Sequence, residues 1–248
     1  MPRIDLNCDL GEGAGHDAEL MALITSANIA CGAHAGDEAT MRASVVLAQR
    51  HGVRVGAHPG FADRENFGRR ELATSPVEAG VLVHGQIRRL QRIAAETGAG
   101  VHHVKLHGAL YTMAARDYDL AVMIAAAVQT TGRDSLLYAP AGSQLIRAAR
   151  LVGLPVAAEV FADRTYQRDG SLTPRSRADA LITDDERAAA QVLRMLREGV
   201  VRSTVGLDVP ITADTVCVHG DGPHAVAVAR RLRQELERAG IEIKAFGA

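Results

Sequence analysis

Aromatic residues and net charge are both scarce in this sequence. Of the 248 residues only 3% are aromatic, tryptophan is absent, and the formal net charge is -1. Proteins that bind nucleic acids combine a basic surface with aromatic side chains that stack on bases, and anionic membranes attract basic segments. The sequence therefore predicts neither a nucleic-acid partner nor a membrane partner.

Cysteine is also rare, and long apolar runs are missing. Cys8, Cys31 and Cys217 are an odd number and form no C-x-x-C pair, which argues against disulfides and a thiolate zinc site and suits a reducing compartment. No run approaches about 18 apolar residues, and the N-terminus lacks the pattern of a signal peptide. We expect a cytoplasmic protein in which Cys8 and Cys217 are small buried hydrophobic residues.

The nucleotide-binding pattern G-x-x-x-x-G-K-[ST] occurs nowhere in the chain. A P-loop ATP site on this chain is therefore excluded. The run HGDGP at 219–223 does place backbone N–H groups at the start of a predicted helix, a geometry that holds phosphate in many barrels.

Predicted strands alternate with predicted helices along almost the whole chain. Strands are predicted over 3–9, at the start of 26–37, and over 53–57, 101–106, 136–139, 156–161, 215–218 and 241–246. Helices are predicted over 17–24, 38–51, 75–97, 117–130, 143–152, 183–198 and 223–239, with a hairpin or lid at 166–177 and an irregular segment or strand pair at 200–212. This alternation predicts one α/β domain over 1–248, a TIM-like (β/α) barrel of parallel strands that is distorted or incomplete.

The first predicted strand has one apolar and one polar face. The alternating residues are Ile4, Leu6 and Cys8 on one face and Asp5, Asn7 and Asp9 on the other. A polar second face is unusual for an internal strand unless that face lines a site.

Ionisable residues also stand where the other predicted strands end. In a parallel barrel the carboxyl ends of the strands surround one mouth, and catalytic groups come from several of them. Four of the ten histidines occupy such positions beside Gly, Ala or Pro. The candidate residues are Asn7, Asp9, Glu12, Cys31, His34, Asp37, His58, Lys105, His107, Glu159, Asp163, Arg164, His219 and Asp221.

Two chemistries could use this set. One is a divalent-metal site that activates water, with candidate ligands Asp9, His34, His58 and His107. The other is metal-free acid/base catalysis, in which Asp9 or Glu159 is the base and a histidine protonates the leaving nitrogen. No H-E-x-x-H or comparable local metal signature is present, so spacing does not separate them.

Lys105 has two interpretations as well. A strand-end lysine in a barrel mouth could hold a substrate carboxylate or a developing oxyanion. It could equally form an ion pair across the mouth with Glu159 or Asp163.

Seven motifs give the chain a family resemblance. They are DLNCDLGE at 5–12, SANIACGAHAGD at 26–37, GAHPG at 56–60, FGRR at 67–70, HGALY at 107–111, AEVFADR at 158–164 and CVHGD at 217–221. The chain resembles the LamB/YcsF family of 5-oxoprolinase A subunits along its whole length. One departure is Leu106, where the family commonly has proline before the histidine.

The resemblance implies ATP-dependent opening of the lactam of 5-oxo-L-proline to L-glutamate. It further implies two partner subunits that supply the ATP chemistry, and a distorted barrel like those of glycoside hydrolases and deacetylases. The residues expected to be catalytic are Asp9, His34, His58, His107 and Glu159. Those expected to bind substrate are Asn7, Glu12, Lys105, Asp163, Arg164, His219 and Asp221.

Two other functions remain open at this point. The chain could be a metal-dependent amide hydrolase or deacetylase that acts alone. It could also be a non-catalytic subunit that binds the lactam and delivers it to its partners.

Overall fold

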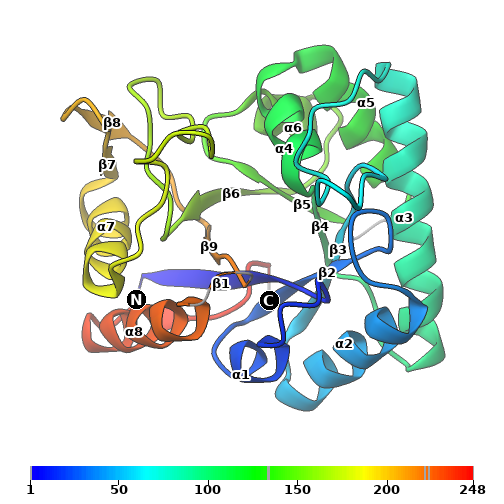
Figure 1. Cartoon of the computed structure of the whole chain (residues 1–248), viewed down its shortest axis with the longest axis horizontal. Coiled ribbons are helices and arrows are strands. Elements are labelled where there is room, and N and C mark those ends of the chain that lie inside the picture. Colours follow the sequence, from blue (N-terminus) through cyan, green and yellow to red (C-terminus); the bar gives the residue numbers. More distant parts are fainter. Residues whose placement is uncertain (1, 133–134, 221, 223, 248) are drawn as a thin grey trace.

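A ring of parallel strands with helices outside it forms the centre of the molecule (Figure 1). The computed structural model describes residues 2–132, 135–220, 222 and 224–247. The strands are β1 (Arg3–Leu10), β2 (Ser26–Ala30), β3 (Arg54–His58), β4 (His103–Lys105), β5 (Leu136–Pro140), β6 (Val156–Phe161), β7 (Val200–Arg202), β8 (Asp208–Pro210), β9 (Thr215–Val218) and β10 (Glu242–Ile243). The helices are α1 (Asp17–Met21), α2 (Glu38–His51), α3 (Pro76–Glu96), α4 (Gly108–Arg116), α5 (Tyr118–Gln129), α6 (Gln144–Leu151), α7 (Asp185–Glu198) and α8 (Ala225–Arg238).

The barrel closes between the two ends of the chain. Among the described residues, β1, β2, β3, β4, β5, β6 and β9 pair in that order, and β9 pairs in turn with β1. All of these pairings are parallel, and Asp5 of β1 lies opposite Thr215 of β9. The predicted distorted or incomplete TIM-like barrel is therefore confirmed, with seven strands in place of the regular eight.

The segments outside the barrel strands differ in detail from the expectations. Residues 200–212 contain the antiparallel pair β7–β8, and the predicted hairpin contains a bridge between Tyr166 and Leu172. The closing strand is only Glu242–Ile243, which pairs with the first residues of β1. Helix α4 was not predicted, because it begins directly after the strand-end motif at His107.

Several of the covering helices begin at side chains that cap them, and α2 and α3 are examples. Asp37 accepts a hydrogen bond from the backbone N–H of Thr40 at the start of α2, and Gly52, with φ of 67°, ends that helix. Ser75 and Glu78 form a capping box at the start of α3. Asp37 is thus a helix cap rather than a site residue, which corrects its place among the candidates.

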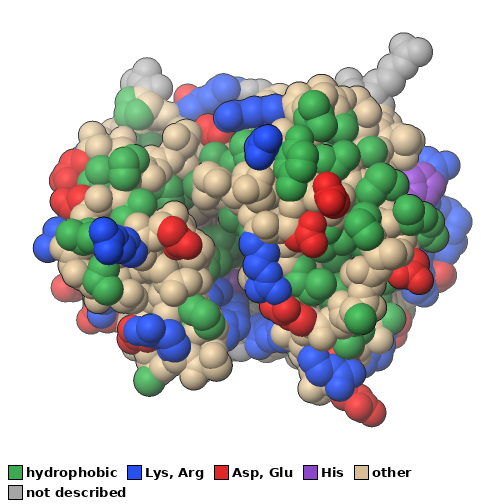
Figure 2. Space-filling view, turned by 90° about the horizontal axis from the view of Figure 1, so that it is seen from above, with side chains coloured by type: hydrophobic (Ala, Val, Ile, Leu, Met, Phe, Trp, Pro, Cys, Tyr) green, Lys and Arg blue, Asp and Glu red, His purple; other side chains and the backbone are tan. Residues whose placement is uncertain are grey.

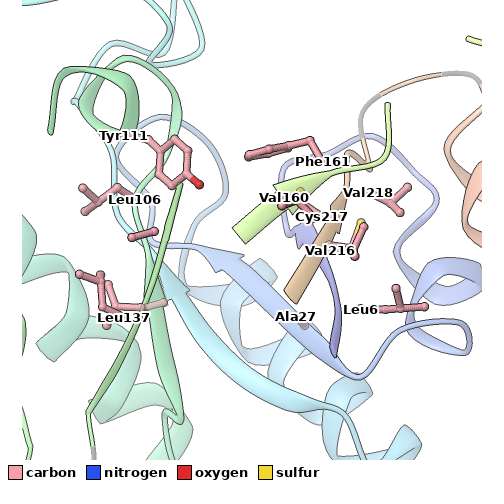
Figure 3. Packing of buried hydrophobic residues seen from close by; sticks show 14 of the residues in the cluster. Leu6, Ala27, Leu106, Tyr111, Leu137, Val160, Phe161, Val216, Cys217 and Val218 are labelled. Carbon is pink, nitrogen blue, oxygen red and sulfur yellow. The ribbon is translucent and has the colours of Figure 1, made fainter. Parts of the chain in front are cut away.

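The two faces of β1 have separate environments. Leu6 and Cys8 belong to the main hydrophobic cluster, other members of which, such as Val160 and Val216, are seen from close by in Figure 3. Asp5, on the other face, accepts hydrogen bonds from the hydroxyl groups of Ser26 at 2.8 Å and Thr215 at 2.5 Å. The barrel therefore packs its apolar faces against the helices and fills its interior with hydrogen-bonded polar groups, as the alternation along β1 indicated.

No helix in the described part of the chain is both long enough and apolar enough to cross a membrane.

Candidate active site

A cavity of about 790 Å³ lies at the carboxyl ends of the barrel strands. The surface is hollowed between two lobes on the face shown in Figure 2, and Lys and Arg side chains lie beside the hollow. The predicted residues that line the cavity are Asp9, Glu12, His58, Lys105, His107, Glu159, Arg164 and His219. Residues that are far apart in the sequence thus meet around one space.

The remaining candidates lie elsewhere. Asn7 and His34 are buried behind the cavity wall, at 0% and 2% exposure. Cys31 is buried, donates to the backbone oxygen of Ile29, and has its pKa raised to about 12 by burial, so it is a poor nucleophile. Asp221 lies outside the described residues.

Lys105 lies at the centre of a buried ionic cluster. Its Nζ is 2.8 Å from Asp9 Oδ1, 2.9 Å from Glu159 Oε1 and 3.3 Å from Asn7 Oδ1. Burial would lower the pKa of Lys105, but Asp9, Cys217 and Glu159 raise it well above its usual range. The ion-pair interpretation of Lys105 is therefore the one that the geometry favours, with Asp9 as a partner that the sequence did not indicate.

Asp9 is held ionised by the same cluster. Burial would raise the pKa of Asp9, but the positive charges of His58 and Lys105 outweigh it and hold the pKa well below its usual range. A carboxylate of such low basicity is a weak proton acceptor at neutral pH.

Two residues that sequence reasoning did not place in the site contact this cluster. Cys217 Sγ lies 3.0 Å from Lys105 Nζ, so it points into the polar interior, which corrects its interpretation as a merely hydrophobic residue. The Tyr111 hydroxyl donates to Glu159 Oε2. The only signal for Tyr111 in the sequence was its place in the HGALY motif.

A second cluster joins Glu12 to three histidines. Glu12 Oε1 lies 3.0 Å from His34 Nε2, 3.2 Å from His107 Nδ1 and 3.7 Å from His58 Nε2. His58 Nε2 also lies 3.0 Å from His107 Nδ1 and 3.4 Å from Asp9 Oδ2. These four residues form a group that could hold a metal ion. Its carboxylate is Glu12 where the sequence suggested Asp9, because Asp9 is bound to Lys105.

Burial acts to lower the pKa of each histidine in this cluster, but the net shift differs among them. It lowers the pKa of His34 to about 4, despite the hydrogen bond to Glu12, and it lowers the pKa of His107. For His58 the charge of Asp9 overcomes the effect of burial, and the pKa is raised. Two of the three imidazoles are thus kept neutral at physiological pH.

His219 and Asp163 form a pair at the cavity wall. His219 Nδ1 lies 2.8 and 2.9 Å from the two carboxylate oxygens of Asp163, and its ring stacks on Phe161 with centroids 5.4 Å apart. An ionised carboxylate only accepts hydrogen bonds, so Nδ1 carries the hydrogen and Nε2 is the basic nitrogen. Burial would raise the pKa of Asp163, but His219 lowers it below the usual value. This is the arrangement in which a carboxylate orients a histidine for proton transfer.

Arg164 connects the cavity to residues 173–180, in the segment between β6 and α7. Its guanidinium donates to the backbone oxygens of Thr173 at 2.6 Å and Ala180 at 3.3 Å. Burial and the charge of Arg175 lower its pKa to about 10. The side chain remains a cation in the cavity lining and also holds this segment in place.

The backbone around His107 has an unusual conformation. Phe67 has φ of 53°, and its carbonyl oxygen lies 2.8 Å from His107 Nε2. Gly108 has φ of 56°, and a Cβ added there would lie 2.5 Å from the backbone oxygen of Gly68. Left-handed φ at a residue with a side chain costs about 1–3 kcal/mol and is maintained only where surrounding contacts require it. Here it places the carbonyl that orients His107.

We expect Gly108→Ala to lower the free energy of unfolding by about 1–3 kcal/mol, because it adds both a left-handed strain and a contact with backbone that cannot move aside. Urea denaturation measures the change. The matched control is Gly85→Ala in α3, where φ is not left-handed and an added Cβ meets nothing within 4 Å. Equal effects of the two substitutions would contradict this account.

The chain is similar to known proteins along its whole length. The LamB/YcsF family profile matches residues 4–248. The 5-oxoprolinase A subunit of Bordetella pertussis is 55% identical over 249 residues, which cover 98% of this chain and 99% of that protein. The crystal structure of a lactam utilization protein from Thermus thermophilus is 46% identical, with a TM-score of 0.92 and coverage of 98% of this chain and 100% of that one. A structure of T48 deacetylase, at 10% identity and a TM-score of 0.51, covers 98% of this chain and 87% of that one and shares the fold alone.

Proposed function

The chain belongs to the LamB/YcsF family, and from this we propose that it is the subunit of a 5-oxoprolinase that binds the lactam of 5-oxo-L-proline and hydrolyses it to L-glutamate. The observation that carries the proposal is the meeting of Asp9, Lys105, His107, Glu159 and His219 around one cavity. The relatives named for lactam chemistry match over nearly the full length of both chains.

We propose that the reaction depends on ATP and on two partner subunits. A five-membered lactam is a resonance-stabilised amide, so phosphorylation of its oxygen would make the carbonyl carbon a better electrophile. The sequence has no P-loop, and the name of the Bordetella relative describes it as one subunit of an enzyme. Partners would then supply the nucleotide chemistry, and this chain the cavity in which water opens the ring.

The pair of His219 and Asp163 is suited to moving the proton. Water oxygen adds to the lactam carbonyl carbon, and the water proton passes to His219 Nε2 while Asp163 stabilises the imidazolium. The C–N bond then breaks, and the same proton passes to the ring nitrogen, which leaves as the amino group of glutamate. The carbon loses its hydroxyl proton and keeps the phosphorylated oxygen as an acyl phosphate, which a second water hydrolyses to the side-chain carboxylate of glutamate and inorganic phosphate. This role replaces the substrate-binding role that the sequence suggested for these two residues.

The cationic side chains of the cavity have different tasks in this proposal. Lys105 is engaged by Asp9, Glu159 and Asn7, so it helps to keep Asp9 ionised and holds both carboxylates in position. Arg164 lines the cavity beside this cluster and is the better candidate to hold the substrate carboxylate. His58 and His107 also line the cavity, where they would position or protonate the substrate.

We treat residues 1–248 as a single catalytic domain, because β1 and β9, from the two ends of the chain, complete the same barrel. The three free cysteines suit a cytoplasmic location.

The proposal is tested by measuring glutamate release from 5-oxoproline with this chain alone, with both partner subunits, and with partners but no ATP. We expect release only in the complete mixture with ATP. Asp9→Ala and His58→Ala should each abolish it in chains whose circular dichroism spectra match the wild type. Undiminished rates in both variants would instead identify a subunit that only delivers the lactam.

A second candidate function is metal-dependent amide hydrolysis by the chain alone. The group of Glu12, His34, His58 and His107 favours it. The same assay distinguishes the two functions, because this one predicts activity without partners or ATP.

A further inference from the structure

We propose that Glu12, His58 and His107 bind one divalent transition-metal ion through Glu12 Oε1, His58 Nε2 and His107 Nδ1, with His34 holding Glu12 in place from behind. The site faces the cavity, since all three ligand residues line it and His34 does not. It has the composition of an open site, with two imidazoles, one carboxylate and a free position for water or substrate.

The hydrogen bonds of the two ligand histidines fix which nitrogen faces the site. His58 Nδ1 lies 2.8 Å from the backbone oxygen of Lys105, and His107 Nε2 lies 2.8 Å from that of Phe67. A carbonyl oxygen only accepts, so each of these nitrogens carries a hydrogen. The opposite nitrogen of His107, Nδ1, is then bare in the neutral ring, and His58 Nε2 becomes bare when His58 releases its second proton, as metal binding requires. Orientation of metal-binding histidines by backbone carbonyls on the far nitrogen is the usual arrangement in metal sites.

The bare nitrogens and a carboxylate oxygen point at one another. His58 Nε2 and His107 Nδ1 are 3.0 Å apart, and Glu12 Oε1 is 3.2 Å from His107 Nδ1 and 3.7 Å from His58 Nε2. Three lone pairs at these distances repel one another unless a cation lies between them. A single proton bridges only one of the three contacts, whereas a metal ion satisfies all of them.

The distances also suit a metal ion. Zinc binds nitrogen and carboxylate oxygen at about 2.0–2.2 Å in tetrahedral geometry, which places neighbouring ligand atoms about 3.3–3.6 Å apart. The observed separations of 3.0, 3.2 and 3.7 Å bracket that range. The imidazole and carboxylate donors favour Zn²⁺ and its neighbours over Mg²⁺ or Ca²⁺.

His34 has a different relation to the site. Its Nε2 lies 3.0 Å from Glu12 Oε1, and its Nδ1 has no hydrogen-bond partner among the described residues. The single hydrogen of the neutral ring is therefore on Nε2, where it donates to Glu12. The His34 ring also stacks on the His107 ring, with parallel planes and centroids 3.7 Å apart. A ring nitrogen binds a metal ion in the plane of its own ring, so His34 Nε2 and His107 Nδ1 do not point at the same ion. His34 is thus a positioning residue and not a ligand.

A bound ion would polarise a carbonyl oxygen or activate water at the cavity wall. The binding site itself does not depend on the proposed reaction. Binding is measured on the chain alone, without ATP or partners, so its failure would leave the test of the lactam reaction unaffected.

The test strips the purified chain with a chelator, reloads it with Zn²⁺ or Co²⁺, and measures metal content by mass spectrometry and the visible absorption of the cobalt form. We expect one equivalent of bound metal ion per chain in the wild type. In Glu12→Gln and His107→Gln we expect the affinity for the ion to fall by more than about 100-fold. His34→Gln should weaken binding by about 10–100-fold, as for residues that orient ligands. The control is His102→Gln, directly before β4, where the ring contacts His103 and not a proposed ligand; this variant should bind as the wild type does.

Thermal melting without metal shows whether each variant is folded. Added Zn²⁺ should raise the melting temperature of the wild type and of His102→Gln, and not that of Glu12→Gln. A wild-type chain that takes up neither ion would overturn the proposal, whether or not the variants fold. Unchanged binding in folded Glu12→Gln and His107→Gln would also overturn it, since the ion would then lie elsewhere.

Discussion

Replacing Lys105 by methionine is expected to lower the free energy of unfolding by about 3–5 kcal/mol, because the substitution leaves Asp9 and Glu159 buried without their shared cation. Lys105 is 2% exposed and lies within 3 Å of both carboxylates. Methionine keeps most of the side-chain volume, so the loss reports the missing charge rather than a cavity. Guanidinium or urea denaturation at neutral pH measures it.

The control for this prediction is Lys244→Met. Lys244 follows β10 and is exposed, so its substitution should change the free energy of unfolding by less than about 0.5 kcal/mol. Adding Glu159→Gln to Lys105→Met should recover part of the loss, since one of the unpaired charges is then removed. A loss below about 1 kcal/mol in Lys105→Met would mean that the carboxylates find other partners and that the ionic cluster does not hold this part of the barrel together.

Replacing His219 by asparagine is expected to lower kcat of the assembled 5-oxoprolinase by about 10²–10⁴-fold, the usual contribution of a general acid/base group. Asparagine can still donate to Asp163 but has no basic nitrogen to take the proton of water. We expect KM for 5-oxoproline to change little, because Arg164 and the cavity wall would still bind the substrate. Steady-state rates with saturating ATP and partners give both constants.

Asp163→Asn should reduce kcat in the same way, because an amide can fix His219 in the wrong tautomer. His51→Asn, an exposed histidine at the end of α2, is the control and should retain the wild-type rate. If His219→Asn kept kcat within a factor of three or so of the wild type, another group would be the base. Glu159 would then be the first to examine, since it lines the same cavity and was a candidate from the sequence.

Local patterns were sufficient to predict most of the fold. Alternating strand and helix segments predicted a parallel barrel, and α2 and α3 begin within one residue of their predicted starts, where Asp37 and Ser75 cap them. These features are short-range, since a helix cap or an alternating strand depends on residues a few positions apart. Helix α4 escaped this reasoning, because its first turn overlaps the strand-end motif of His107.

The sequence by itself determined that several ionisable side chains stand at the barrel mouth. Asp9, His58, Lys105 and His219 follow or end parallel strands, and parallel strands bring their carboxyl ends to one place whatever their exact register. Only the tertiary structure decided which of them contact one another. Lys105 pairs with Asp9 as well as Glu159, and Glu12 joins the histidines where Asp9 was expected. Such contacts depend on the tilt and stagger of strands far apart in the sequence. Cys217 and Lys105, for example, are 112 residues apart, and no local pattern records the geometry that brings them together.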